Sequence, residues 1–143
     1  MMINKYHAKG QYYDGHYFGS TLEAKVYHLL KKYDDRLLVH PQLTLVNGKK
    51  PWRPITWKPD FYSPVFNQYI EVKGALTTEF KFKMQLINYL NPGMIEDIWF
   101  VTRNRSYRWQ GIYLMNIDEF QRHLKTQEFK VNRRTSTREK STL

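Results

Sequence analysis

The sequence of 143 residues contains no cysteine, which excludes disulfides, thiolate nucleophiles, zinc fingers and iron–sulfur clusters in one step. Any metal ion bound by this chain must therefore be held by oxygen or imidazole ligands. No apolar run approaches the roughly 18 residues that a membrane-spanning helix needs, and residues 1–7 lack the apolar core of a signal peptide. We therefore expect a protein that is not secreted and works inside a cell.

Acidic side chains are scarce relative to basic ones. Thirteen Asp and Glu stand against 23 Lys and Arg, which gives a formal net charge of +10. Such an imbalance favours polyanions, nucleic acid above all, as partners. The length is typical of one domain, and a hydrophobic content of 41% is enough to form its core.

The positive charge gathers at the C-terminus. Residues 121–143 hold seven basic and two acidic side chains, and from Lys130 onward only Val131 and Leu143 are apolar. Such a segment cannot bury a face. We therefore expect a single domain over residues 1–129 followed by a basic, disordered tail over 130–143, which serves either nucleic-acid binding or solubility.

Periodicity and turn signals predict the elements of the domain. Asp14-Gly15 between aromatic residues predicts a hairpin over 11–18. Ser20 with Glu23 three positions later forms a capping box and predicts a helix over 20–33, and Thr78 is expected to cap a second helix that ends near residue 90. Strands are predicted over 37–46, 55–61, 68–73, 98–101 and 112–115, with a short helix over 118–124. This order is typical of a mixed α/β domain with a central sheet.

Four charged residues of these elements can meet. Glu23 lies on the first helix and Asp60 on the polar face of the second strand; Glu71 and Lys73 share one face of the third strand, about 6.6 Å apart. If the two strands pair, the carboxylates converge. Clustered carboxylates repel unless a hard divalent cation such as Mg²⁺ or Mn²⁺ neutralises them. In a cationic protein, such a site predicts phosphate chemistry, in which Lys73 can orient a water molecule or offset charge in the transition state.

Each of these residues also has an ordinary structural explanation. The capping box accounts for Glu23, a solvated ion pair accounts for Glu71 and Lys73, and a polar strand end accounts for Asp60. Their conjunction on the appropriate elements favours a real site. The five histidines show no metal-ligand spacing, and we expect most of them to be structural.

Pro59-Asp60, ten further residues and then Glu71-Val72-Lys73 resemble the signature of the PD-(D/E)XK nuclease superfamily. Including Phe18-x-Ser20-x-Leu22-Glu23, the chain is similar over residues 18–125 to phage endonuclease I, a family of Holliday junction resolvases. A group of small phage nucleases shares the Asp14-Gly15 hairpin.

The resemblance implies a restriction-endonuclease-like αβββαβ core and a homodimer. It also implies that Mg²⁺ or Mn²⁺ is bound by Asp60, Glu71, Glu23 and the backbone carbonyl of Val72, and that Lys73 is catalytic. We expect the hairpin residues Tyr12 to Phe18 to form part of the dimer contact.

Basic side chains around this constellation are candidates for contacts to the DNA backbone. Lys81 and Lys83 are the better candidates because their helix follows the catalytic strand. The others are Lys49, Lys50, Arg53, Lys58, Arg103, Arg105, Arg108, Arg133 and Arg134, with Trp52, Tyr107 and Trp109 interleaved for stacking.

The sequence therefore predicts a divalent-metal-dependent endonuclease that hydrolyses DNA phosphodiester bonds, with branched DNA as the expected substrate and no small-molecule cofactor or membrane as a partner. Two alternatives stay open. One is a transposase-like or restriction-like nuclease of the same superfamily, and the other is a non-catalytic basic module that binds DNA or RNA.

Overall fold

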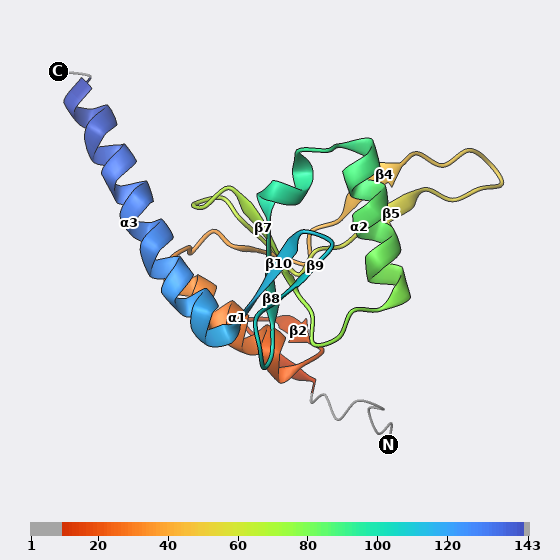
Figure 1. Cartoon of the computed structure of the whole chain (residues 1–143), viewed down its shortest axis with the longest axis horizontal. Helices are drawn as coiled ribbons and strands as arrows, with labels where there is room; N and C mark the ends of the chain where they lie inside the picture. The colour runs from red at the N-terminus through yellow and green to blue at the C-terminus, as the bar shows by residue number, and fades with distance from the viewer. Residues whose placement is uncertain (1–9, 142–143) are drawn as a thin grey trace.

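The computed structural model describes residues 10–141, and the side chains of residues 10–135 (Figure 1). The helices of this part are α1 (Thr21–Lys31), α2 (Thr78–Leu90), α3 (Ile117–Ser141) and a short 3-10 helix, η1 (Met94–Asp97). The strands are β1 (Gln11–Tyr13), β2 (His16–Phe18), β3 (Leu38–Val39), β4 (Leu43–Val46), β5 (Ile55–Trp57), β6 (Phe61–Ser63), β7 (Gln68–Val72), β8 (Ile98–Thr102), β9 (Tyr107–Trp109) and β10 (Ile112–Asn116).

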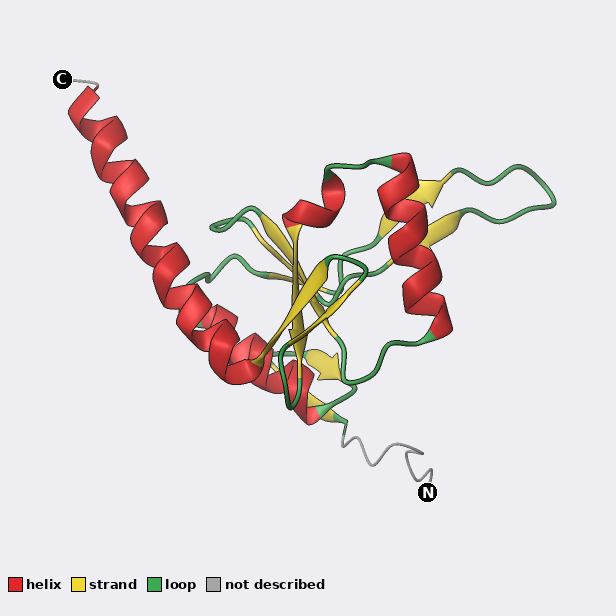
Figure 2. Ribbon diagram, in the orientation of Figure 1, coloured by secondary structure: helices red, strands yellow, loops and turns green. Residues whose placement is uncertain are grey.

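A six-stranded mixed sheet forms the centre of the fold, with the strand order β3-β6-β7-β8-β10-β9. Its middle strands β7, β8 and β10 run parallel, whereas the outer pairings are antiparallel. Helices α1 and α3 lie together on one side of this sheet and α2 lies on the other (Figure 2). The expected α/β class with a central sheet is confirmed.

Two hydrophobic cores, one on each face of the sheet, hold the layers together. Strand β8 supplies both, because Ile98 and Phe100 point to the α2 side and Val101 to the α1–α3 side. The apolar run from Ile98 is thus buried on both faces, as predicted. The core on the α1–α3 side also holds Phe61 and Ile70, which are fully buried.

The predicted helix starts are close to those observed. The Ser20 hydroxyl accepts a hydrogen bond of 3.1 Å from the Glu23 backbone N–H, and α1 ends at Lys31, two residues before the predicted end. Helix α2 is capped by Thr77 rather than by Thr78, since the Thr77 hydroxyl accepts from the Phe80 N–H. In both helices the cap satisfies a backbone donor of the first turn, which would otherwise lack a partner.

The predicted hairpin over 11–18 is also confirmed, with β1 and β2 paired antiparallel. Asp14 and Gly15 form its turn with φ angles of 52° and 80°. Positive φ at both central residues is the geometry for which Asp-Gly is favoured.

Two predicted strands are each broken in two. The segment 37–46 divides into β3 and β4 around His40-Pro41, and the segment 55–61 divides into β5 and β6 around Pro59. Proline has no backbone N–H to donate to a ladder. As a result β4 and β5 leave the main sheet and pair with each other, and Asp60 lies just before β6 rather than inside a strand.

Strand β9 and η1 have no counterpart in the sequence prediction. Strand β9 forms a hairpin with β10 through Gln110 and Gly111, both at positive φ. Gln is an uncommon residue for such a position, so the pattern gave no turn signal. The strand from Ile112 was predicted and is present.

The prediction of a disordered tail is wrong for residues 130–141. The predicted helix over 118–124 instead extends as α3 to Ser141, in one run that leaves the body of the molecule (Figure 1). Residues 117–141 contain neither Pro nor Gly, and they are rich in Lys, Arg, Gln and Glu, all good helix formers. A segment without an apolar face cannot pack against the core, but it can still form a helix.

None of the helices in the described part of the chain is long and apolar enough to cross a membrane. The N-terminal residues 1–7, on which the expectation about a signal peptide rests, lie outside the described residues.

A buried carboxylate, Asp34, joins the end of α1 to the β6–β7 hairpin and was not singled out in the sequence. Its oxygens accept hydrogen bonds from the Ser63 hydroxyl (2.6 Å), the Arg36 N–H (2.8 Å) and the Val65 N–H (3.1 Å). Asp34 is only 1% exposed. A buried acceptor with three donors is a structural anchor.

We expect Asp34→Ala to lower the free energy of unfolding by about 2–4 kcal/mol, because three donors lose their partner at once. Urea denaturation followed by circular dichroism measures this change. Asp35→Ala, at the exposed neighbouring position, is the matched control and should change stability by less than about 0.5 kcal/mol. Equal effects of the two substitutions would show that Asp34 is not an anchor.

Candidate functional site

The strand register brings Asp60 and Glu71 together. Strands β6 and β7 pair antiparallel with Phe61 opposite Ile70. Extending this pairing by one position puts Asp60, the residue before β6, opposite Glu71. Directly opposed residues in a ladder point to the same face. Because Phe61 and Ile70 face the α1–α3 core, the two carboxylates face the side of α2.

His40 extends this row by one strand. Strand β3 pairs with β6 through Val39 and Phe61, and the His40 N–H continues the ladder to the Asp60 carbonyl at 2.9 Å. His40, Asp60 and Glu71 therefore lie side by side on three neighbouring chain segments.

Glu23 reaches the same place from the first turn of α1. Its Oε1 lies 2.6 Å from His40 Nε2, and its Oε2 accepts a hydrogen bond from the Gly19 N–H at 3.2 Å. The side chain is only 12% exposed. The helix start and the site thus both use Glu23, since its backbone N–H is the donor that Ser20 caps.

Glu23, His40 and Asp60 each offer one ligand atom, and these three atoms lie within 4.8 Å of one another. His40 thus stands apart from the other histidines, most of which we expect to be structural, because it lies in a cluster that could hold a metal ion. No spacing in the sequence could show this, because His40 joins the cluster only through the pairing of the two-residue strand β3 with β6.

Burial raises the pKa of both Asp60 and Glu71. Burial, with the Glu71 and Glu23 carboxylates beside it, raises the pKa of Asp60 well above its usual range, against the opposing effect of a 2.7 Å hydrogen bond from the Val72 N–H. Burial also raises the pKa of Glu71, and the Lys73 ammonium is the main opposing influence. A shift of this kind means that the charged form lacks the compensation it has in water.

Glu71 is fixed on both of its oxygens. The buried Trp57 indole N–H donates to Oε2 at 2.8 Å, and the Lys73 ammonium lies 4.0 Å from Oε1. Trp57 is a site residue that the sequence did not indicate, because its apolar pattern is also that of a core residue. Lys73 is 31% exposed and lies 5.5 Å from the centre of the Phe80 ring, so its ammonium is positioned at the mouth of the site.

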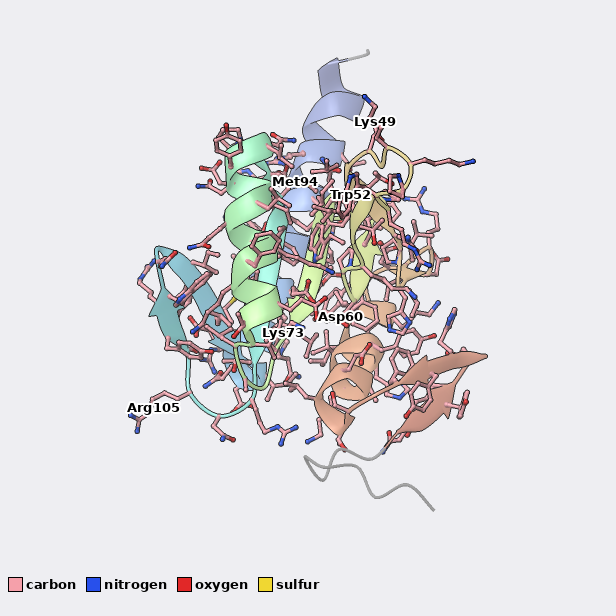
Figure 3. All side chains as sticks on the ribbon, turned by 90° about the vertical axis from the view of Figure 1, so that its right-hand side faces the viewer. Lys49, Trp52, Asp60, Lys73, Met94 and Arg105 are labelled. Carbon is pink, nitrogen blue, oxygen red and sulfur yellow. The ribbon has the colours of Figure 1, made fainter. Side chains whose placement is uncertain are left out.

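The structure therefore brings together all four residues of the predicted constellation, Glu23, Asp60, Glu71 and Lys73. Figure 3 labels two of them, Asp60 and Lys73. The candidate donor set consists of carboxylate oxygens, which are the ligands that Mg²⁺ and Mn²⁺ prefer, and one imidazole, which is more typical of transition-metal sites. The remaining predicted ligand is the carbonyl of Val72, whose N–H binds Asp60.

Two hollows lie beside the C-terminal end of β7, and both carry predicted DNA contacts. A cavity of about 230 Å³ on the α2 side is lined by Glu71 and Lys73 together with Lys58 and Lys83, and Lys83 also pairs with Glu79 at 3.0 Å. A cavity of about 690 Å³ reaches from Ser20 and Val72 to Arg103 and Arg105. Basic side chains thus flank the acidic cluster on two sides.

The other predicted contacts are spread over the molecule. Lys81 is exposed on α2, and Lys49, Lys50 and Arg53 lie on the loop between β4 and β5. Arg133 and Arg134 lie on the part of α3 that leaves the body, away from the cluster (Figure 1). Arg108 covers the ring of Tyr113 at 5.0 Å.

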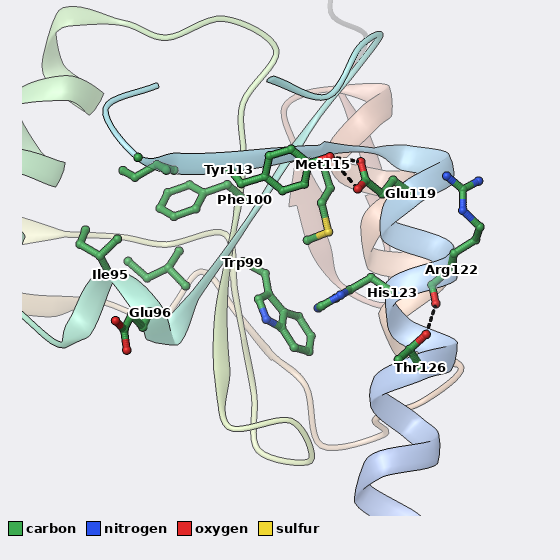
Figure 4. A pocket seen from close by; sticks show the side chains of 13 residues that line it. Ile95, Glu96, Trp99, Phe100, Tyr113, Met115, Glu119, Arg122, His123 and Thr126 are labelled. Carbon is green, nitrogen blue, oxygen red and sulfur yellow. Dashed lines mark hydrogen bonds between the residues drawn. The ribbon is translucent and has the colours of Figure 1, made fainter. Parts of the chain in front are cut away.

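Another cavity, of about 520 Å³, is lined from η1, β8, β10 and α3 and contains none of the four predicted site residues (Figure 4). Glu119, one of its two acidic residues, accepts hydrogen bonds from the Ser106 and Tyr113 hydroxyls. His123, also in its wall, has a pKa lowered mainly by burial. These groups do not converge on one point as the acidic cluster does.

We expect Mn²⁺ or Mg²⁺ to raise the melting temperature of the wild-type chain by roughly 5–10 °C at a concentration a hundredfold above its Kd. In EDTA, Asp60→Asn should melt higher than the wild type, because it removes one of three crowded carboxylates while an amide oxygen can still accept from Val72. It should also lose the response to metal. Differential scanning fluorimetry measures both effects.

Asp35→Asn, at an exposed position, is the control and should keep the metal response. A metal response that survives in Asp60→Asn, or an Asp60→Asn chain that melts lower in EDTA, would contradict this interpretation of the cluster.

Comparison with known proteins places the chain in a family. No curated protein and no solved structure matches it. The model of the family DUF1064, described as a protein of unknown function, matches residues 3–111, a segment that includes Glu23, His40, Asp60, Glu71 and Lys73. This match covers most of the sequence, and the chain is therefore a member of the DUF1064 family.

Proposed function

We propose that this protein is a divalent-metal-dependent endonuclease that hydrolyses DNA phosphodiester bonds. The observation that carries the proposal is the register of β6 and β7, which sets Asp60 opposite Glu71 with Lys73 two residues further along the chain. The net charge of +10 and the basic side chains beside the cluster fit a polyanionic substrate.

The order of the elements also supports the proposal. If the β4–β5 excursion is set aside, the elements α1, β3, β6, β7, α2 and β8 follow one another along the chain. This is the αβββαβ order of the proposed PD-(D/E)XK core. The strands of this set are neighbours in the sheet, in the order β3-β6-β7-β8.

The proposed chemistry divides among five residues of the site. Asp60 and Glu71 hold the metal ion, with Glu23 and His40 beside them, and the bound ion supplies Lewis-acid chemistry to the scissile phosphate. Lys73 keeps its ammonium at the mouth of the site, where it can donate to a phosphate oxygen whose negative charge grows in the transition state. In the reaction a water oxygen bonds to phosphorus, one bridging P–O bond breaks, and the departing sugar oxygen takes up a proton.

We expect Glu71→Gln to abolish cleavage and Lys73→Ala to slow it by about 10²–10³-fold, since each removes a group that acts on the scissile phosphate. Supercoiled, linear and four-way-junction DNA incubated with Mg²⁺, Mn²⁺ or EDTA provide the assay. Lys25→Ala, which removes an exposed lysine of α1, is the control and should cleave at the wild-type rate.

Cleavage that persists in EDTA, or undiminished activity of both site variants, would contradict the assignment. Tight binding without cleavage under every metal condition would instead support the alternative of a non-catalytic nucleic-acid-binding module. Efficient cleavage of linear DNA with no preference for junctions would favour a restriction-like or transposase-like nuclease over a resolvase.

A homodimer is part of the proposal, because resolution of a four-way junction needs two incisions and one chain carries a single Asp60–Glu71–Lys73 set. Two-fold symmetry supplies the second set. The β1–β2 hairpin offers exposed aromatic surface for the contact: Tyr12 and Tyr17 are 75% and 49% exposed, and their rings lie 5.0 Å apart.

Light scattering in moderate salt should therefore give a mass about twice 17.4 kDa for the wild type. The double substitution Tyr12→Ser and Tyr17→Ser should lower it to that of one chain, because two apolar rings leave the contact. Tyr89→Ser changes an exposed aromatic residue on α2, outside the hairpin, and should leave the mass unchanged. A wild-type mass near 17.4 kDa would overturn the dimer.

A further inference from the structure

The loop between β4 and β5, residues 47–54, is a basic projection with one exposed indole. It carries Lys49, Lys50 and Arg53 and no acidic residue. Trp52 is 78% exposed at this loop. A large aromatic side chain left in water, with cations on both sides of it, marks a surface that meets an anionic partner with apolar faces.

The tip of this loop is a closed turn. The Trp52 N–H donates to the Lys49 carbonyl at 2.7 Å, and the two residues form an isolated antiparallel bridge. A Cβ atom at Gly48 would lie 2.6 Å from the Pro54 nitrogen and 2.8 Å from the Trp52 carbonyl oxygen, so the two sides of the loop are in close contact. Pro51 and Pro54 restrict the backbone further. A turn closed in this way presents the indole at little cost in conformational entropy on binding.

The loop is anchored to the acidic cluster through β5. Trp57, the last residue of that strand, holds Glu71 through its indole N–H. Trp52 and the cluster residues Asp60 and Lys73 lie on one side of the molecule, with Trp52 above the other two (Figure 3). The five residues from Trp52 to Trp57 span at most about 17 Å of extended chain, so the indole lies within a few nucleotides of the cluster.

We propose that Trp52 is a base-stacking site for single-stranded DNA, and that Lys49, Lys50 and Arg53 bind the phosphates on either side of the stacked base. The inference rests on the proposed nuclease function and extends it to a second contact, a few nucleotides from the cut. Stacking on an indole needs a free base face, which a duplex buries between its own base pairs, whereas a single strand offers one at every nucleotide. The loop therefore selects DNA in which unpaired bases lie near the cleavage position.

Binding measured without metal separates this inference from catalysis. The probe is a fluorescently labelled oligothymidylate of about ten nucleotides, compared with a duplex of the same length, in EDTA and with the full chain. We expect Trp52→Ala to weaken binding to the single strand about ten- to a hundredfold and binding to the duplex less than about twofold. Trp52→Phe should keep most of the affinity, because it keeps an aromatic face. Tyr89→Ala, at another exposed aromatic position, is the control and should bind like the wild type.

An equal loss for single strand and duplex would overturn the stacking site and leave only a phosphate contact. Unchanged single-strand binding in Trp52→Ala would overturn the inference altogether, as would a Trp52→Phe chain that binds as weakly as Trp52→Ala. Because these measurements need no cleavage, a chain that binds single strands through Trp52 but cuts nothing supports the stacking site and contradicts only the nuclease. If the chain cuts DNA but Trp52→Ala binds single strands as well as the wild type does, the result supports the nuclease and contradicts the stacking site.

Discussion

Burial of two facing carboxylates, Asp60 and Glu71, is the constraint to which the surrounding structure responds. Burial raises the pKa of both carboxyl groups, and the Glu71 and Glu23 carboxylates raise the pKa of Asp60 further. The neighbouring groups reduce this cost without removing it: the Val72 N–H donates to Asp60, and the Trp57 indole donates to Glu71. Both partners are donors, so they stabilise the ionised form of the carboxylates, which is the form a metal ion binds. Under the proposed function, this arrangement prepares the site for a cation, which would offset the cost of burying the carboxylates.

The two hydrophobic cores fix the register on which this arrangement depends. Phe61 and Ile70 are the neighbours of the two carboxylates in the chain, and both are fully buried against α1 and α3. A shift of β6 and β7 by one residue would turn the two acidic side chains into that core and the apolar side chains toward the site. The free energy gained by burying Phe61 and Ile70 therefore also holds Asp60 and Glu71 in place. The apolar residues of β6 and β7 specify the site as much as the acidic ones do.

The sequence predicted the parts of the site that depend on local periodicity. Glu71 and Lys73 are two residues apart in an extended segment that the sequence predicts, and Glu23 lies in the first turn of a helix whose start the sequence also predicts. His40 was missed because its role arises from the pairing of β3 with β6, and Trp57 was missed because its role arises from a side-chain hydrogen bond between β5 and β7. The length of α3 was missed for another reason, since the sequence was judged by whether it could bury a face, and a polar helix leaving the body needs none.

Three carboxylates are clustered near the end of β7, and basic side chains lie on the elements around them. Under the proposed function, this arrangement links metal binding to DNA binding. The surrounding Lys and Arg side chains attract a phosphate backbone, but an unneutralised acidic cluster repels the one phosphate that must reach it. A bound cation removes that repulsion, so metal and DNA each increase the affinity of the site for the other by the same factor. Under the proposed function, the buried acids therefore control the access of the scissile phosphate as well as hold the ion, and the cationic surroundings contribute to DNA binding at a distance from the cut.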